Sequence, residues 1–334
     1  MRDIRNIALS IMLGFIPFSE AIAHSHKQHV IKRKIDWAGM LTEPRYITRY
    51  VIMLAIGIFV FFLLKSGKMN RKAKVAILLI SLIIFGVAGN FLGALGLQPS
   101  PVCAAVKPFL FGMMAPFMIF LSVIILLTLL GPKLFCGWVC PVGAVQELIS
   151  MISDRLGIRR WNFSFRLSNT LRIALLAAFF LLSVTSVIHL TRGSNEVPVS
   201  LYNYFNAFYG LTIESQRNFS AYLKNYLPFL LTVLLAFILY RPYCHFICPI
   251  GLYTNIVEQF AVFRVSLNQR NCNNCSLCIR KSPCKALPYI VRKSKLRADC
   301  FACNRCLECC NRKAFSISTG KVTGNKELDT YNCN

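Results

Sequence analysis

Two copies of one cysteine motif, each at the end of an apolar stretch, limit what this chain can fold into more than any other feature. The first copy reads LFCGWVCPVG and the second reads PYCHFICPIG, so both contain Cys-x3-Cys-Pro-x-Gly. Their cysteines are Cys136 and Cys140 in the first copy and Cys244 and Cys248 in the second. A residue before proline avoids the helical region, whereas proline fits the first turn of a new helix. Each motif therefore predicts a joint between two helices, and the apolar spacing after each proline predicts an amphipathic helix at a membrane interface.

The apolar stretches themselves predict membrane-spanning helices. Of the 334 residues, 55% are hydrophobic and only 15% are charged. Most of the stretches approach the roughly 20 residues that a spanning helix needs, and strands in lipid would leave backbone groups unpaired. They are Tyr50–Leu64, Val75–Leu97, Pro108–Leu130, Leu171–Leu190 and Leu227–Tyr240. We expect a mostly α fold, with a polytopic helical membrane domain over residues 50–263 and a small C-terminal ferredoxin-like α+β iron–sulfur domain over residues 264–334.

The N-terminus has the pattern of a secretory signal. Arg2 and Arg5 precede an apolar stretch, and Ala21-Ile22-Ala23 is a small-x-small sequence. We expect a signal peptide over residues 1–23 and a short external leader over residues 24–49, with an uncleaved extra span as the alternative. After cleavage, the new amine at His24 and the imidazole of His26 would offer nitrogen ligands that suit copper(II) or nickel(II). An ordinary hydrophilic leader explains the same segment.

Basic residues predict the orientation of the helices. Lys and Arg gather in the loop at 65–74 and in the loop after the first motif, whereas the loops at 98–107 and 192–226 hold few. Both motifs and the C-terminal domain are therefore expected in the cytoplasm, in a multi-pass protein of the bacterial inner membrane. The basic segment 24–49 disagrees unless export of a cleaved signal overrides its charge. The formal net charge of +25 fits membrane lipids or an acidic redox partner, and no nucleic-acid motif accompanies it.

Two cysteine triplets near the C-terminus predict a pair of 4Fe–4S clusters. Three thiolates at Cys-x2-Cys-x2-Cys spacing bind three corners of a cubane, and in two-cluster ferredoxins the fourth ligand comes from the other run. Structural zinc is the alternative, but zinc sites usually take Cys-x2-Cys pairs. The first ferredoxin set is Cys272, Cys275, Cys278 and Cys310, and the second ferredoxin set is Cys284, Cys300, Cys303 and Cys306.

The sequence departs from the usual ferredoxin pattern in two ways. Five residues separate Cys278 from Cys284 instead of three, and no proline follows either fourth cysteine. Cys309 competes with Cys310 as a ligand, although the usual three-residue spacer favours Cys310. The chain has 15 cysteines, most of them at motif spacing, which indicates metal ligation in a reducing compartment and not a disulfide scaffold.

The four cysteines of the paired motifs, here called the motif thiols, allow three interpretations. They form a shared metal or cluster site, or a redox-active dithiol set, or they pack as small hydrophobic residues beside the helix joints. His245 lies inside the second motif and would tune or ligate such a site. Cys103 lies in the short loop before the third apolar stretch, where a lone thiol is more often structural than catalytic. His189 lies near the end of the fourth stretch and is expected to be an ordinary helix-end histidine; for His189, quinone or haem binding is the alternative. No role is assigned to Cys333.

With repeated Cys-x3-Cys-Pro motifs followed by Cys-x2-Cys-x2-Cys runs, the chain resembles the NapH/NosR-type membrane polyferredoxins over about Tyr50–Phe315. The resemblance implies cytoplasmic 4Fe–4S clusters that link the quinone/quinol pool, or a cytoplasmic electron donor, to a periplasmic reductase in anaerobic respiration. A flavoprotein or cytochrome subunit is a further expected partner. We thus expect an electron-transfer component of an oxidoreductase and not a stand-alone enzyme. The alternatives are a copper- or iron-handling maturation factor and a redox sensor.

Overall fold

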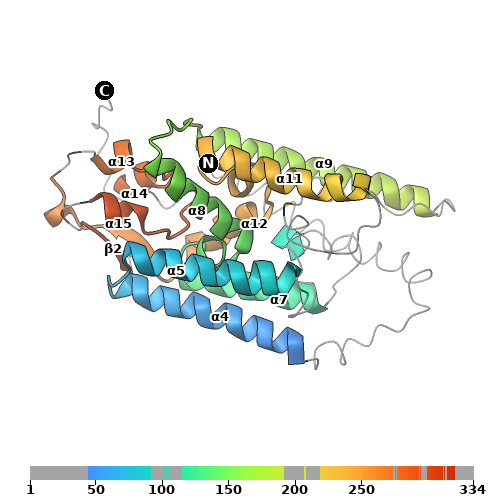
Figure 1. Cartoon of the computed structure of the whole chain (residues 1–334), viewed down its shortest axis with the longest axis horizontal. Coiled ribbons are helices and arrows are strands. Elements are labelled where there is room, and N and C mark those ends of the chain that lie inside the picture. Colours follow the sequence, from blue (N-terminus) through green and yellow to red (C-terminus); the bar gives the residue numbers. More distant parts are fainter. Residues whose placement is uncertain are drawn as a thin grey trace.

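The computed structural model describes residues 44–91, 101–102, 104–105, 115–191, 207, 219–273, 275, 277–292, 294, 299–310, 312 and 314–319. Its long helices run along the longest axis, and the C-terminal elements gather at one end (Figure 1). The expected signal peptide and leader, with His24 and His26, lie outside the described residues, as do Cys103 and Cys333. The backbone of His189 lies in a described helix, but its side chain is outside the description.

Helices form where the apolar stretches predict them, but fewer of them qualify as membrane spans. The helical segments are α4 (Pro44–Lys65), α5 (Arg71–Ser81) continued by the π-helix η1 (Leu82–Phe91), α7 (Ala115–Leu130), α9 (Phe165–Thr191) and α11 (Phe219–Ile238). Within the described chain, two stretches are long and apolar enough to cross a membrane, Ile47–Lys65 and Phe165–Leu182; Phe117–Leu130 and Tyr226–Ile238 are shorter apolar helices. Five spans are therefore not confirmed. α7 has 16 residues, fewer than the roughly 20 that a bilayer requires, whereas α11 has 20. The second stretch is divided between α5 and η1.

Several helices carry large apolar side chains on their outer surface. α4 packs against α7, and α8 (Pro141–Arg155) packs against both α5 and α11. On the outward side of α4, Val51, Phe59 and Phe62 are all more than half exposed, and Leu181 of α9 is 69% exposed. Apolar surface of this extent is uncommon on a protein surrounded by water alone.

Both cysteine motifs fold in the same way. The first cysteine lies in a π-helical turn, η2 (Phe135–Val139) or η4 (Tyr243–Ile247). The second cysteine is extended, with φ −67° and ψ 120° at Cys140 and φ −69° and ψ 117° at Cys248, and its N–H donates to the first carbonyl of the turn. A new helix then starts: α8 at Pro141, and α12 (Ile250–Val257) one residue after its proline. The predicted joints are confirmed, and the duplication extends to the backbone.

The helix after the first motif is largely buried within the protein, and its buried face is more polar than the sequence predicts. In α8 the apolar stripe is incomplete because Ile152 is 49% exposed. Its buried residues instead include Gln146, Glu147 and Ser150. The reason is that α8 packs against helices and the C-terminal region on several sides, where its polar groups find partners.

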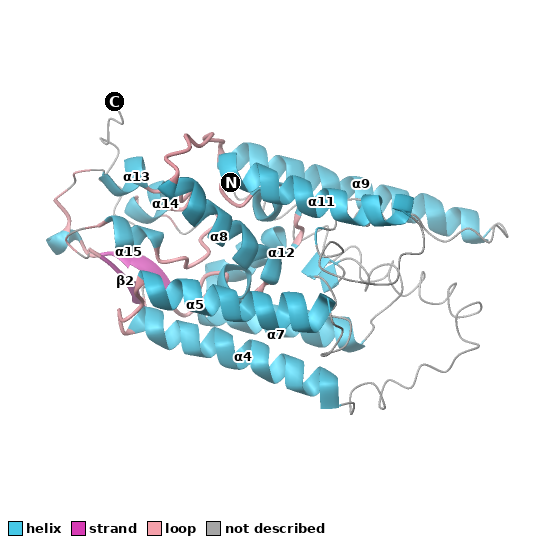
Figure 2. Cartoon of the chain, in the orientation of Figure 1, coloured by secondary structure: helices cyan, strands magenta, loops and turns pink. Residues whose placement is uncertain are grey.

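The C-terminal region is closed by a small sheet. β1 (Arg264–Leu267) follows the short η5 (Glu258–Phe260) and pairs antiparallel with β2 (Phe315–Ser318), with Val265 opposite Ile317. The cysteine-rich segment between the strands holds η6 (Gln269–Asn271), α13 (Leu277–Lys281), α14 (Leu287–Val291) and α15 (Arg305–Cys309) (Figure 2). The sheet thus joins the two ends of this segment, and contacts between α4 and β2 attach it to the helices.

Candidate metal centre

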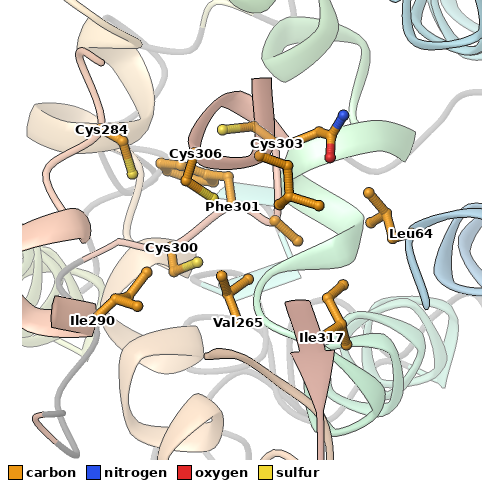
Figure 3. Close-up of a pocket in the computed structure, with 12 residues that line it drawn as sticks. Leu64, Val265, Cys284, Ile290, Cys300, Phe301, Cys303, Cys306 and Ile317 are labelled. Carbon is orange, nitrogen blue, oxygen red and sulfur yellow. The ribbon is translucent and has the colours of Figure 1, made fainter. Parts of the chain in front are cut away.

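The second ferredoxin set surrounds one pocket. Cys284 comes from the loop before α14, whereas Cys300, Cys303 and Cys306 come from the loop before α15 and from its first turn. Figure 3 shows the four side chains around a common space, with Val265, Ile290 and other apolar residues beside them. The structure therefore brings a cysteine from one run to the triplet of the other, which is the exchange expected of a two-cluster ferredoxin.

Backbone amides point at the sulfur atoms of this set. Cys284 accepts from the amides of Ala286 and Leu287. Cys300 accepts from Ala302, and Cys306 accepts from Leu307. Hydrogen bonds of this type are among the means by which proteins stabilise thiolates bound to iron and tune their reduction potential.

Burial makes these thiols poor acids in the absence of a bound cation. Burial raises the pKa of Cys284 to about 12, and the charge of Cys303 adds to this effect. Burial likewise raises the pKa of Cys300 well above its usual value, with Glu258 contributing. A coordinating metal removes the thiol proton outright and supplies the missing positive charge. The burial, the amides and the gathering of four cysteines at one pocket suit a bound cluster.

The first ferredoxin set is more exposed. Burial raises the pKa of Cys278, the Ile279 amide lowers it, and the charges of Cys310, Cys272 and Cys275 raise it further, so these three thiols lie within electrostatic range of Cys278. Cys309 lies instead within electrostatic range of Glu308, Arg305, Asp154 and Cys303, and Cys303 belongs to the second ferredoxin set. This arrangement favours Cys310 as the fourth ligand, and its ligation stays a prediction.

The four motif thiols lie together and are buried. Each is between 6% and 9% exposed. Burial raises the pKa of Cys136 to about 12, with a further rise from Cys244, while the charges of Lys133 and Arg241 lower it. Burial also raises the pKa of Cys140, to which Cys244, Cys136 and Cys248 all contribute.

Donors are directed at the motif thiols as well. The Gly143 amide donates to Cys140 Sγ over 3.4 Å, and Gln146 Nε2 donates to Cys244 Sγ over the same distance. The Ile250 amide hydrogen-bonds Cys248. Glycine is required in the first motif because a Cβ on Gly143 would collide with the Cys136 carbonyl. Among the described residues, no three His, Cys, Asp or Glu side chains are grouped closely enough to hold one metal ion directly.

Residues 299–306, which hold Cys300, Cys303 and Cys306, are here called the cluster loop. A buried carboxylate, Asp299, connects this loop to both motifs. It directly precedes Cys300 and is ion-paired with Lys133 of the first motif segment and with Arg172 of α9, the latter over 2.7 Å. His245 Nδ1 of the second motif lies 3.1 Å from the same carboxylate. Burial raises the pKa of Asp299, but the charges of Lys133 and Arg172 outweigh it and hold that pKa well below its usual range.

A second buried carboxylate, Glu147 of α8, has three cationic partners. Arg305 lies 2.8 Å away, Lys74 2.9 Å and Arg241 3.0 Å. Burial raises the pKa of Glu147, but the charges of Arg305, Lys74 and Arg241 outweigh it and keep the group ionised. Arg305 stands between Cys303 and Cys306, so this network connects the cluster loop to α5, to α8 and to the segment before η4.

Backbone contact brings the first motif directly against the cluster loop. A Cβ on Gly137 would collide with the Phe301 carbonyl oxygen, so only glycine allows this approach. Trp138 Nε1 donates to the carbonyl of Ala302 over 3.2 Å. Phe301 and Ala302 lie between Cys300 and Cys303, so the motif thiols and the second ferredoxin set are adjacent parts of one packed structure.

The sequence reasoning missed the charged residues that hold these sites together. Lys133 and Arg241 each stand three residues before the first cysteine of a motif, and both adopt a positive φ, of 45° and 49°. A repeated basic residue at the same distance before each motif was a signal in the sequence. The carboxylates of Glu147 and Asp299 gave no such signal, because their partners are distant in sequence.

Comparison with known proteins agrees with this geometry. A family model described as a 4Fe–4S binding domain matches residues 113–159 and 225–268. Each matched segment contains one Cys-x3-Cys-Pro motif. The family model therefore covers the motif thiols and ends before the first cysteine triplet.

Curated relatives are similar over about half to three-fifths of the chain. The ferredoxin-type protein NapH of Haemophilus influenzae is 28% identical over 59% of this chain and 66% of its own length. The putative electron transport protein YccM of Escherichia coli is 27% identical over 62% of this chain and 60% of its own length. The regulatory protein NosR of Stutzerimonas stutzeri is 27% identical over 47% of this chain and 21% of its own length. No solved structure matches. The expected resemblance to NapH- and NosR-type proteins is confirmed, and the match to a 4Fe–4S binding domain supports bound iron–sulfur clusters.

Proposed function

This chain is related to the NapH- and NosR-type membrane-associated ferredoxin proteins, and on that premise we propose that it is a membrane-bound electron-transfer subunit. It would accept electrons from the quinol pool or from a cytoplasmic donor and deliver them toward a periplasmic reductase, through a flavoprotein or cytochrome subunit. The chain covers 66% of the length of NapH of Haemophilus influenzae and 60% of that of YccM.

Two 4Fe–4S clusters are assigned to the two ferredoxin sets, and a further metal or cluster centre to the motif thiols. A bound 4Fe–4S cluster supplies one-electron transfer without making or breaking substrate bonds. The protein's own residues fix the spacing: Asp299 and Arg305, both in the cluster loop, are anchored to residues of the two motif segments and of α8. This anchoring is the observation that carries the proposal, because it makes the ligand sites neighbours in one rigid, buried arrangement.

The membrane part of the proposal rests on the helices. Two are long and apolar enough to span, and the outward faces of α4 and α9 are apolar. We propose that shorter helices complete a multi-pass domain in the inner membrane, with the C-terminal region and both motifs on the cytoplasmic side. The elements that hold the ferredoxin sets, α13, α14 and α15, lie at one end of the molecule, which is consistent with a single side for them (Figure 1).

A metal-handling role is the second candidate, and burial argues against it. Transfer of metal to a partner requires thiols that the partner can reach, as thiol exchange does. The motif thiols are at most 9% exposed. Buried ligands suit a resident centre better than a transferred ion.

Anaerobic reduction by quinol tests the proposed function. Membranes that contain the full chain are mixed with a water-soluble quinol, and EPR follows the appearance of reduced clusters. Cys303→Ser should lose one cluster signal, whereas Cys309→Ser should retain all of them. Clusters that neither quinol nor a low-potential cytoplasmic ferredoxin reduces would contradict the proposal, and release of iron to a chelator on reduction would favour metal handling.

A further inference from the structure

Arg241 lies between the motif thiols and the second ferredoxin set. Its side chain is completely buried, and it stands three residues before Cys244. The guanidinium donates to the carbonyls of Cys136 over 3.0 Å and of Gly137 over 3.3 Å. One cation therefore contacts the first motif while it belongs to the segment of the second.

The other face of the guanidinium covers the cluster loop. Its carbon lies 4.7 Å from the centre of the Phe301 ring, and Phe301 follows Cys300 directly. Lys133, the equivalent residue of the first motif, lies 5.3 Å from the same ring. The ring is thus approached by the two equivalent basic residues of the duplicated motifs.

Arg241 has one carboxylate partner, Glu147, and shares it with Lys74 and Arg305. The other two cations have further carboxylates, since Arg305 also pairs with Asp154 and Lys74 also lies 3.9 Å from Glu308. Burial lowers the pKa of Arg241, but the charges of Tyr240, Glu147, Cys244 and Cys303 raise it above its usual value. A buried charge is costly unless it is paired. Of the two thiols near Arg241, Cys244 is a motif thiol and Cys303 belongs to the second ferredoxin set.

We propose that Arg241 links the two ligand sites electrostatically and raises the reduction potential of the centres they hold. The inference rests on the proposed function. Each electron taken up adds a negative charge beside the guanidinium, which favours the reduced state. Because Arg241 contacts both motif segments and the cluster loop, it acts on more than one centre, unlike a residue that only pairs with Glu147.

The test is a redox titration of the anaerobically purified full chain, monitored by EPR. Arg241→Gln should move the potential of the second-set cluster to more negative values, with at least a tenfold change in the redox equilibrium, or 59 mV for one electron. Arg241→Lys keeps the charge and should restore most of the shift. Lys74→Gln is the matched control, because Lys74 pairs with the same carboxylate from α5, and its shift should be much smaller.

Equal shifts for Arg241→Gln and Lys74→Gln, or an unchanged potential with full iron content, would overturn the inference. If Arg241→Gln does not retain iron, two double variants replace it. Arg241→Gln/Glu147→Gln and Lys74→Gln/Glu147→Gln have the same net charge, and the inference requires the more negative potential in the first. Absence of iron–sulfur signals from the wild type would instead contradict the proposed function.

Discussion

Cys309 and Cys310 are adjacent, yet their surroundings differ. Cys310 is within electrostatic range of Cys278, whereas Cys309 ends α15 and has Cys303 among its neighbours. We expect Cys310→Ser to lose one cluster, about four irons per chain, because the first ferredoxin set then keeps three thiolates. Cys309→Ser should keep its iron. Quantification of iron and acid-labile sulfide compares the two, and the opposite pattern would exchange their assignments.

Gly137 is the residue at which the first motif touches the cluster loop most closely. Gly137→Ala would force a Cβ against the Phe301 carbonyl, and such overpacking typically costs about 1–3 kcal/mol. Gly86→Ala is the control, because its nearest neighbour is the tip of the Leu82 side chain. Thermal unfolding in detergent should show a clear loss for Gly137→Ala and little change for Gly86→Ala. Equal stability of the two variants would mean that the loop around Phe301 can move away from residue 137 at no cost in stability.

At the level of single residues, local spacing predicted which cysteines lie near one another, and their ligation stays a prediction. The exchange of Cys284 and Cys310 between the runs follows from the ferredoxin pattern, and the structure brings the same residues together. The roles of Glu147 and Asp299 could not be predicted, because Glu147 meets Arg305 across 158 positions of the chain. No periodicity or motif encodes such a pair.

Among the helices, α8 carries the most consequential polar residue. Glu147→Gln would leave Lys74, Arg241 and Arg305 without their buried carboxylate, and loss of one partner from a buried pair costs about 3–5 kcal/mol. Asp154→Asn is the control, because that carboxylate is 41% exposed and surface pairs contribute about 0–1 kcal/mol. Unfolding in denaturant separates the two, and similar losses would show that the network adds little.

The stability difference between the wild type and Glu147→Gln depends on pH in a defined way. The folded pKa of Glu147 is depressed, so its stabilising contribution is present above the unfolded pKa of about 4.3 and is lost only as pH falls toward the folded value. The difference in melting temperature between the wild type and Glu147→Gln should be constant from pH 8 to pH 5 and should narrow below about pH 4. A difference that already narrows between pH 7 and pH 6 would contradict an ionised Glu147 with a depressed pKa.

For the elements, apolar composition predicted helices correctly, and two of the five expected spans qualify among the described residues. Helix α5 begins at Arg71, and its Lys74 is buried against Glu147 instead of lying in a basic loop. The positive-inside pattern treats such a lysine as solvated, although here its partner comes from α8. Helix ends near a packed domain therefore depend on tertiary contacts that composition does not contain.

At the scale of the whole molecule, the C-terminal elements that hold the ferredoxin sets lie at one end of the long helices (Figure 1). Reporter fusions at the C-terminus test the proposed orientation: a fluorescent protein should be bright and alkaline phosphatase inactive. As a control, the same reporters after a known exported signal should behave in the opposite way. An active phosphatase fusion would place the cluster region outside and would reverse the proposed direction of the electron path.

The most direct test of the account is the iron and acid-labile sulfide content, with EPR spectra, of the anaerobically purified chain beside a variant with Cys136, Cys140, Cys244 and Cys248 all changed to serine. Two clusters account for about eight irons per chain. We expect more than eight in the wild type, falling to about eight in the variant, with the signals of the two ferredoxin sets retained. About eight in both would remove the metal centre from the motif thiols. Zinc in place of iron would contradict electron transfer by this protein altogether.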